Sequence, residues 1–321
     1  MMTRRVCFAL LFSIVFCTAI ITLALAVKAV FGHPFKRELL VSKFHGDLPR
    51  TSWLRIVRLV ISPGTLPGPL AHLASVYPIS SQSGPCPILW ETPFGPFWGR
   101  SWDGDLLVFL MAEQDIVHVY ERAPVVVRKG DVVLDAGANL GTFTRFALRR
   151  GAQRVIAFEP EPTNIACFKD TFRRELDAGQ VVLVEAALWD SSSTLDFSEP
   201  PEGNSGLGSA VGRNGTASVT VRATTIDESV AGLNLDRVDF IKMDIEGAEA
   251  RALLGGPKTL ARFSPRMALS IEHLPGDAEA ISEAVLRAKP DYRALRGGTV
   301  FYFYPPSMEP PAPLPPGGDD H

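Results

Sequence analysis

The chain has 321 residues, a formal net charge of −3 at pH 7 and four cysteines. This length is enough for one α/β domain of about 200 residues together with extra segments. The charge argues against a protein that binds nucleic acid through bulk electrostatic attraction. No CxxC pair or Cys/His metal spacing occurs, so neither a disulfide scaffold nor a zinc site is predicted, and we expect Cys167 to be a small buried residue.

The N-terminal part of the chain predicts a membrane anchor. Residues 6–27 carry no charged side chain, and a helix of this length, at about 1.5 Å per residue, would cross a bilayer core of about 30 Å. More basic residues follow this stretch than precede it, so the positive-inside rule predicts a single-pass protein with its catalytic domain in the cytoplasm. Cleavage near the small residues Ala24 and Ala26 is the alternative, and it would release a soluble mature form.

Two flanking stretches lack the pattern of a folded core. Residues 28–85 are predicted to be a juxtamembrane linker. Within it, Thr51–Ile61 mixes apolar and basic residues and suits either a helix on the bilayer surface or a helix packed on the folded domain. Residues 305–321 are rich in proline and are predicted to be a disordered tail. We therefore expect the folded domain over residues 86–304.

The stretch VVLDAGANLG at residues 132–141 is the most informative part of this domain. Its apolar run predicts a strand buried on both faces that ends at Asp135, where the ligand crevice of an open α/β sheet lies. Gly137 and Gly141 allow a tight turn and a close ligand approach. An acid before the glycines, in place of a GxGxxG loop, disfavours a pyrophosphate and favours a cationic nucleoside such as S-adenosylmethionine (SAM). The alternative is an Asp135 that only caps the turn.

A second acid ends the next apolar run. Residues 154–160 read RVIAFEP, so Glu159 follows a predicted strand. The two oxygens of a carboxylate in this place can accept both ribose hydroxyls of a nucleoside. NAD-binding folds use the same device, and a solvated loop carboxylate is the structural alternative. Glu159 therefore supports a nucleoside site without selecting the cofactor.

Strands and helices alternate through the domain, which predicts a parallel sheet with helices on both faces. A short glycine-containing stretch separates Tyr292–Leu295 from Val300–Tyr304, which is typical of a hairpin. Five parallel strands closed by an antiparallel C-terminal hairpin match the Rossmann-like sheet of class I SAM-dependent methyltransferases. The predicted strands are Val132–Leu134, Val155–Phe158, Val181–Val184, Phe240–Met243 and Ala268–Ile271, and the predicted helices are Thr142–Arg150, Thr163–Leu176, Ala248–Leu254 and Ala278–Ala288.

Acidic residues follow the fourth predicted strand, in the stretch VDFIKMDIEGAE at residues 238–249. Asp244 and Glu246 lie at the carboxyl end of that strand, and Glu246 and Glu249 are expected on one face of the next helix N-terminus. These carboxylates suit a base for a hydroxyl or ligands for a hard cation. The structural alternative is helix capping with surface charge.

The fifth predicted strand ends with Glu272 and His273, beside the fourth strand in the expected sheet. An alcohol is a poor nucleophile, so methyl transfer to a hydroxyl by direct displacement needs a base within reach of its proton. Asp244, Glu246 and His273 are the candidates for this catalytic role, and the sequence does not rank them. We expect no obligatory metal, because methyl transfer creates no strong new negative charge.

Four motifs together resemble the FkbM-type SAM-dependent methyltransferases: GDVVLDAGANLGTFT (130–144), AFEPEPTN (157–164), TTIDE (224–228) and DFIKMDIEGAEARALLGG (239–256). The resemblance covers residues 90–304 and implies O-methylation of a small-molecule or glycan/lipid-linked acceptor with SAM as cofactor. It implies that Asp135, Gly137, Asn139 and Gly141 line the SAM site and that Glu159 holds the ribose. Residues 185–188, including Ala187, occupy the place where methyltransferases contact adenine.

Two other functions stay open. An NAD(P)-dependent oxidoreductase would carry GxGxxG after the first strand, and this chain does not. A membrane-anchored, degenerate methyltransferase fold could bind SAM or a partner without turnover, although it would not need acids at three strand ends. The expected partners are a hydroxyl-bearing acceptor and, through the N-terminal helix, a membrane, with no nucleic acid.

Overall fold

The computed structural model describes residues 76–114, 118–198, 208–211 and 218–308. The chain divides into two units, residues 1–77 and 78–321, and the elements that build the site belong to the second unit. The predicted anchor at 6–27, the possible surface helix at Thr51–Ile61 and residues 309–321 of the predicted tail lie outside the described residues.

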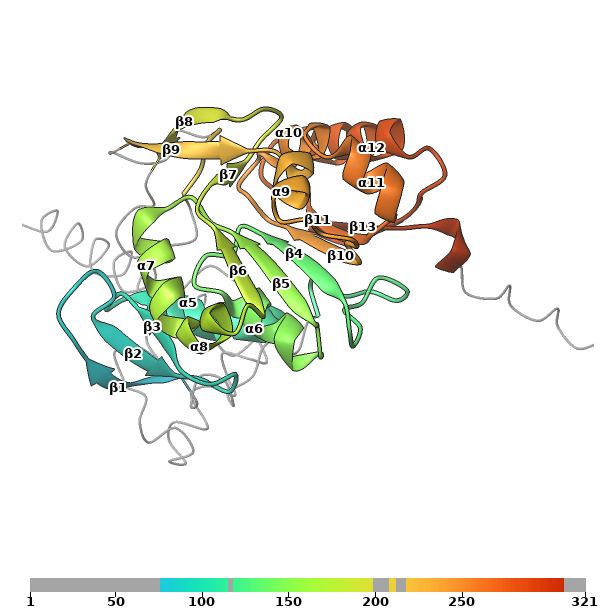
Figure 1. Ribbon diagram of the computed structural model, residues 1–321. Coiled ribbons are helices and arrows are strands. Elements are labelled where there is room, and N and C mark those ends of the chain that lie inside the picture. The colour runs from blue at the N-terminus through green and yellow to red at the C-terminus, as the bar shows by residue number, and fades with distance from the viewer. Residues whose placement is uncertain (1–75, 115–117, 199–207, 212–217, 309–321) are drawn as a thin grey trace, which may run out of the picture. The chain divides into compact units, whose positions relative to one another are not determined.

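A mixed sheet with the strand order β12-β13-β11-β10-β4-β5-β6 forms the centre of the second unit (Figure 1). The first five strands in chain order run parallel, and the hairpin β12–β13 closes the sheet antiparallel to β11. The predicted α/β architecture is therefore confirmed. The strands are β4 (Val132–Ala136), β5 (Arg154–Phe158), β6 (Val181–Val184), β10 (Phe240–Met243), β11 (Arg266–Ser270), β12 (Arg293–Arg296) and β13 (Val300–Tyr304).

Two groups of helices cover the two faces of this sheet (Figure 1). Val132, Leu134 and Ala136 of β4 belong to one buried core with residues of α9 to α12, while Val133 and Asp135 point to the opposite face because side chains alternate along a strand. Both faces are buried, which explains the continuous apolar runs in the sequence. The helices are α6 (Thr142–Arg149), α7 (Pro162–Thr171), α8 (Arg173–Asp177), α9 (Ile226–Gly232), α10 (Glu249–Leu254), α11 (Pro257–Phe263) and α12 (Asp277–Ala288).

Two small sheets accompany the central one. The first has the order β1-β2-β3 and is followed by a helix, and the second has the order β7-β9-β8 and follows β6. Strand β1 lies within the stretch 28–85 that the sequence assigned to a linker. The elements are β1 (Tyr77–Ser81), β2 (Ile88–Glu91), β3 (Phe97–Gly99), α5 (Asp103–Ala112), β7 (Ala187–Leu188), β8 (Ser193–Ser198), β9 (Ser218–Thr224) and the short 3-10 helix η2 (Pro306–Met308).

A disulfide joins Cys86 to Cys167 of α7, a bond that the sequence did not indicate, whereas Cys167 is buried as expected. The two residues are 81 positions apart in the sequence, and no local spacing could reveal the pair. The fold brings their Cα atoms to 5.3 Å, within the range that a disulfide spans. Both cysteines are buried, so a covalent bond that is shielded from solvent links the β1–β3 segment to α7.

The predicted location in a membrane, with a cytoplasmic catalytic domain, is also wrong. Among the described residues, no helix is long and apolar enough to cross a bilayer. The longest of these helices, α12, has 12 residues and spans only about 18 Å of the roughly 30 Å that a bilayer core requires. The disulfide also disagrees with the predicted compartment, because such bonds are rare in cytosolic proteins.

Candidate active site

A cavity of about 480 Å³ lies at the carboxyl ends of the central strands. Residues from the turn after β4, from the end of β5 and from the segments after β10 and β11 line it, together with residues of α5 and β7. The strand order reverses between β4 and β10, because the chain continues to β5 on one side and returns on the other. Such a reversal creates the crevice in which open α/β sheets bind ligands.

The turn after β4 forms part of the cavity lining through Gly137 and Asn139. Gly137 has φ of 77°, and a Cβ at this position would lie 1.9 Å from the main-chain oxygen of Asp244. Only glycine therefore fits where the ends of β4 and β10 meet. Asn139 also has a positive φ, of 51°, and its backbone N–H donates to Glu159 Oε2 at 2.7 Å.

Asp135 and Gly141 lie outside the cavity lining. Asp135 is fully buried, accepts a hydrogen bond from Thr144 Oγ1 at 2.7 Å and lies 3.4 Å from Lys242 Nζ. Burial raises the pKa of Asp135, and the charge of Lys242 opposes that rise. Because side chains alternate along β4, a residue at the strand end can face a helix rather than the crevice. Gly141 is required by packing, since a Cβ there would lie 2.2 Å from the ring of Phe172.

Lys242 of β10 ties Asp135 to the turn. Its Nζ donates to the main-chain oxygens of Gly137 at 2.7 Å and Ala136 at 3.1 Å. Lys242 is buried and lines the cavity, although no role was predicted for it within the 239–256 motif. Asp135 and Lys242 together therefore stabilise the glycine turn, because Lys242 contacts Asp135 as well as two main-chain oxygens at the end of β4.

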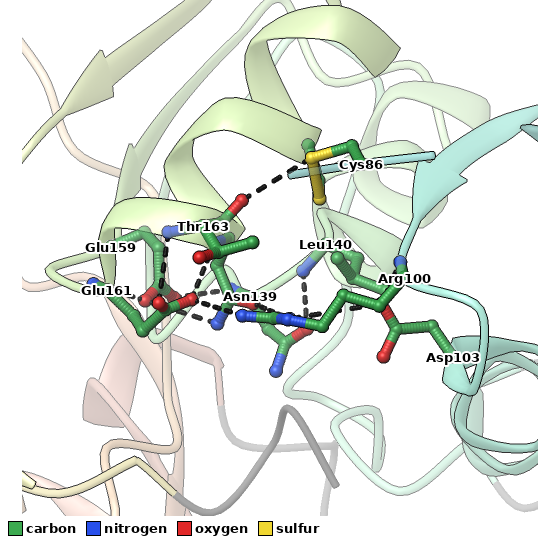
Figure 2. A network of polar contacts seen from close by, with 10 residues as sticks. Cys86, Arg100, Asp103, Asn139, Leu140, Glu159, Glu161 and Thr163 are labelled. Carbon is green, nitrogen blue, oxygen red and sulfur yellow. Dashed lines mark hydrogen bonds and ion pairs between the residues drawn. A yellow bond between two sulfur atoms is a disulfide. The ribbon is translucent and has the colours of Figure 1, made fainter. Parts of the chain in front are cut away.

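Glu159, at the end of β5, is buried and lines the cavity (Figure 2). Its Oε2 accepts from Asn139 N–H, and its Oε1 accepts from Glu161 N–H at 2.9 Å and from Asn164 Nδ2 at 3.5 Å. Burial raises the pKa of Glu159 to about 7, and the backbone hydrogen bonds oppose that rise. Ala187 of β7, predicted beside the adenine, also lines the cavity.

The fold brings Asp244, Glu246 and His273 together at another part of the lining. His273 Nε2 lies 3.3 Å from Asp244 Oδ1 and 3.7 Å from Glu246 Oε1. His273 Nδ1 lies 3.2 Å from Oε1 of Glu249, which is fully buried. Glu246 precedes α10 with φ of 56°, so it does not share a helix face with Glu249 as the sequence suggested.

The ionisation of this cluster is strongly coupled. Burial lowers the pKa of His273, but the adjacent carboxylate of Glu249 and the charges of Asp244 and Glu246 outweigh it and raise the pKa to about 9. Burial raises the pKa of Glu246 to about 7, against the opposing charge of His273. One potential ligand atom each from Asp244, Glu249 and His273 lies within 4.8 Å of the others. However, each ring nitrogen of His273 already faces a different carboxylate, so an imidazolium accounts for the arrangement.

Glu113 and Tyr120 also line the cavity, and no role was predicted for either from the sequence. Tyr120 donates its hydroxyl hydrogen to Asp244 Oδ2 at 2.6 Å, and burial followed by the charge of Asp244 raises the tyrosine pKa well above its usual value. Burial, followed by repulsion from Asp244 and Glu272, raises the pKa of Glu113 to about 8. The only signal was an acid and a tyrosine within an apolar stretch upstream of the first predicted strand.

Comparison with known families bears on this site, because a model described as "Methyltransferase FkbM domain" matches residues 135–295. The chain belongs to the FkbM methyltransferase family. The match contains Glu159 and the acidic cluster, but it begins after the β1–β3 segment, α5 and Tyr120. The resemblance that the sequence motifs indicated is therefore confirmed.

Three curated relatives of this FkbM domain are 26% to 29% identical to the chain over the aligned residues. The hexuronic acid methyltransferase AglP of Haloferax volcanii is 28% identical over 192 residues, covering 56% of this chain and 70% of that protein. The 31-O-demethyl-FK506 methyltransferase FkbM of Streptomyces tacrolimicus is 29% identical over 175 residues, covering 46% and 67%. The 2-O-methyltransferase NoeI of Sinorhizobium fredii is 26% identical over 163 residues, covering 45% and 65%.

Among solved structures, the chain is similar to the methyltransferase FkbM from Methylobacillus flagellatus KT. The TM-score is 0.44 at 20% identity, and the alignment covers 64% of this chain and 56% of that chain.

Proposed function

We propose that this FkbM-family protein is a SAM-dependent methyltransferase that methylates a hydroxyl of a small-molecule or glycan/lipid-linked acceptor by direct displacement. The observation that carries the proposal is a single cavity whose lining holds both Glu159 beside a glycine turn and the Asp244, Glu246 and His273 cluster. A candidate nucleoside site and a set of proton acceptors thus share one cavity. When bound, SAM supplies an electrophilic methyl group on a sulfonium.

The cofactor residues divide into those that would touch SAM and those that support them. Each Glu159 oxygen has remaining lone pairs that can accept a ribose hydroxyl, because a carboxylate offers about four acceptor sites. Gly137, Asn139 and Ala187 line the space around it. Asp135 acts indirectly in this proposal. It pairs with Lys242, and Lys242 donates a hydrogen bond to the main-chain oxygen of Gly137 in the turn.

The pKa shifts and hydrogen bonds of Asp244, Glu246 and His273 allow these three candidate bases to be ranked. His273 would be protonated at neutral pH, because its pKa is raised to about 9 by the surrounding carboxylates despite burial. Asp244 already accepts a hydrogen bond from Tyr120. Glu246, with a pKa raised to about 7 by burial, matches the pH at which a general base works well. We assign Glu246 to accept the proton of the acceptor hydroxyl. Asp244 and His273 would orient that hydroxyl.

The charge of the cavity favours a neutral acceptor. Asp244, Glu246 and Glu272 contribute carboxyl groups to the lining, against the imidazolium of His273 and a Lys242 that is paired with Asp135. Glu113 also lines the cavity, but with its pKa raised to about 8 it is mostly uncharged at neutral pH. Carboxylates accept hydrogen bonds from hydroxyls, whereas an acidic acceptor would be repelled. The proposal therefore favours a neutral hydroxyl-bearing acceptor over an acidic one.

Calorimetric titration of the full chain with SAM and with S-adenosylhomocysteine tests the cofactor. Methyl-labelled SAM with panels of neutral and acidic hydroxyl compounds then tests transfer. We expect binding of both nucleosides and transfer to a neutral hydroxyl. Absence of SAM binding would refute the proposal, and binding without transfer to any acceptor would favour a module that does not turn over.

A further inference from the structure

The β1–β3 segment precedes the FkbM match and is bonded to α7, the helix that follows Glu159. The disulfide between Cys86 and Cys167 joins this segment to α7. Within β3, the backbone N–H of Trp98 donates to Thr171 Oγ1 of α7 at 2.9 Å. The segment therefore has two fixed points on α7, one covalent and one through the main chain.

Arg100 follows β3, and its side chain extends from this segment toward Glu161 (Figure 2). It is only 8% exposed. Its Nη2 donates to Glu161 Oε2 at 2.6 Å, and its Nη1 donates to Asn164 Oδ1 at 2.8 Å. The backbone N–H of Arg100 donates to the buried Asp103 Oδ2 at 2.7 Å, which holds the main chain at this point.

Both partners of Arg100 contact Glu159. Glu161 caps α7 by accepting from Thr163 N–H and Asn164 N–H, and its own N–H donates to Glu159 Oε1. Asn164 donates to the same oxygen through Nδ2. The guanidinium thus lies one residue removed from the carboxylate that faces the cavity (Figure 2).

We propose that Arg100 is a positioning residue for the Glu159 carboxylate, so that the segment preceding the family match forms part of the cofactor site. This inference rests on the function proposed above, in which Glu159 accepts the ribose hydroxyls. A planar guanidinium suits the role because its fixed fork contacts a carboxylate and an amide at the same time.

Electrostatics support the same role. Burial raises the pKa of Glu159, and the neighbouring charge of Glu161 raises it further. The Arg100 guanidinium balances the Glu161 charge at 2.6 Å. Removal of the guanidinium would leave Glu161 without this countercharge and would favour the protonated form of Glu159. Removal of the Glu161 charge would favour the ionised form.

The test compares SAM affinity in full-length variants across the pH range around the Glu159 pKa. Arg100→Met should weaken SAM binding about tenfold at neutral pH and move the pH midpoint of binding upward. Arg100→Lys should restore the midpoint but not the full affinity, because lysine keeps the charge and lacks the fork. Glu161→Gln should move the midpoint downward, and opposite shifts are not expected from a general loss of folding.

Arg266→Met is the matched control. Arg266 is also buried and forms an ion pair with Asp131 at 2.8 Å, but neither residue lines the cavity. Its loss should lower the melting temperature and leave the SAM pH profile unchanged. Wild-type affinity and pH profile in Arg100→Met would overturn the inference, as would shifts of the same sign in Arg100→Met and Glu161→Gln. If the wild-type protein itself does not bind SAM, the proposed function fails instead.

Discussion

Two carboxyl groups in the same cavity have a pKa raised to about 7, chiefly by burial, yet their surroundings differ. Glu159 is held by backbone N–H groups of Asn139 and Glu161. Glu246 lies beside other ionisable side chains, with His273 at 3.7 Å. The main-chain donors fix the Glu159 carboxylate in a single geometry. In the other group, a change in the ionisation of Glu246 affects that of His273 and the reverse. In the function proposed above, the lining around Glu159 is the cofactor part, held by main-chain donors, and the lining around Glu246 is the acceptor part, where the proton would be taken up.

The largest expected effect concerns the acceptor part. Glu246→Gln should lower the methyl-transfer rate by about 10²- to 10⁴-fold, the range that general-base catalysis contributes. SAM affinity should stay near the wild-type value, because the base matters only when the acceptor proton leaves. In the wild-type protein at saturating SAM, the rate should rise as pH rises through about 7, since Glu246 must be ionised. Equal losses of rate and SAM affinity would contradict the division between the two parts.

The next effect concerns Asp135, which pairs with Lys242 and so supports the turn after β4. The sequence alone predicts that Asp135→Ala abolishes SAM binding and leaves the fold intact. With Asp135 fully buried and 3.4 Å from Lys242, the substitution leaves an uncompensated buried charge. We now expect a loss of about 3–5 kcal/mol in the free energy of unfolding together with the loss of binding. Denaturant unfolding measures the first quantity, and an unchanged midpoint would restore the original prediction.

The disulfide tests whether the cofactor part depends on the segment that precedes the family match. Replacing both Cys86 and Cys167 by serine should cost about 2–5 kcal/mol in the free energy of unfolding. Peptide mapping under non-reducing conditions should recover the two residues in one linked peptide, as the structure has them. Because α7 also carries the partners of Glu159, we expect SAM affinity to fall more than the transfer rate at saturating SAM. Free thiols at both positions in the folded protein would show that this account is mistaken.

The central sheet and the position of most of the predicted site residues along the cavity could be predicted, because both follow from local patterns. Buried parallel strands leave continuous apolar runs, and their carboxyl ends share one edge, which brings Glu159, Asp244 and His273 to one cavity. The direction of a side chain at a strand end does not follow from such runs: Asp135, which the sequence predicts to face the cofactor, contacts Thr144 and Lys242 and lies outside the cavity lining. Arg100 and the disulfide depend on packing between distant segments, which leaves no periodic signal.

A smaller effect is expected from Glu159→Gln. This variant keeps the shape but loses the charge that strengthens hydrogen bonds to the ribose, so SAM affinity should fall by about 1.5–3 kcal/mol. Wild-type affinity should rise as pH rises through about 7, because the ionised carboxylate is the better acceptor, and the glutamine variant should lack this step. Calorimetry at several pH values measures both. A pH step that survives in Glu159→Gln would assign the titration to another group.

The smallest effect is expected from removal of divalent cations. The acceptor part holds carboxylates and an imidazole that lie close together, but Nε2 of His273 faces Asp244 and Nδ1 faces Glu249. An ion bound there would have to displace the imidazolium from at least one carboxylate. Methyl transfer from a sulfonium also removes positive charge rather than creating an anion that a metal would stabilise. Dialysis against a chelator should therefore leave the transfer rate unchanged, with Glu246→Gln as the reference for a disabled acceptor part. Loss of activity that Mg²⁺ or Mn²⁺ restores would show that the cluster binds a cation and that Glu246 is not sufficient as the base.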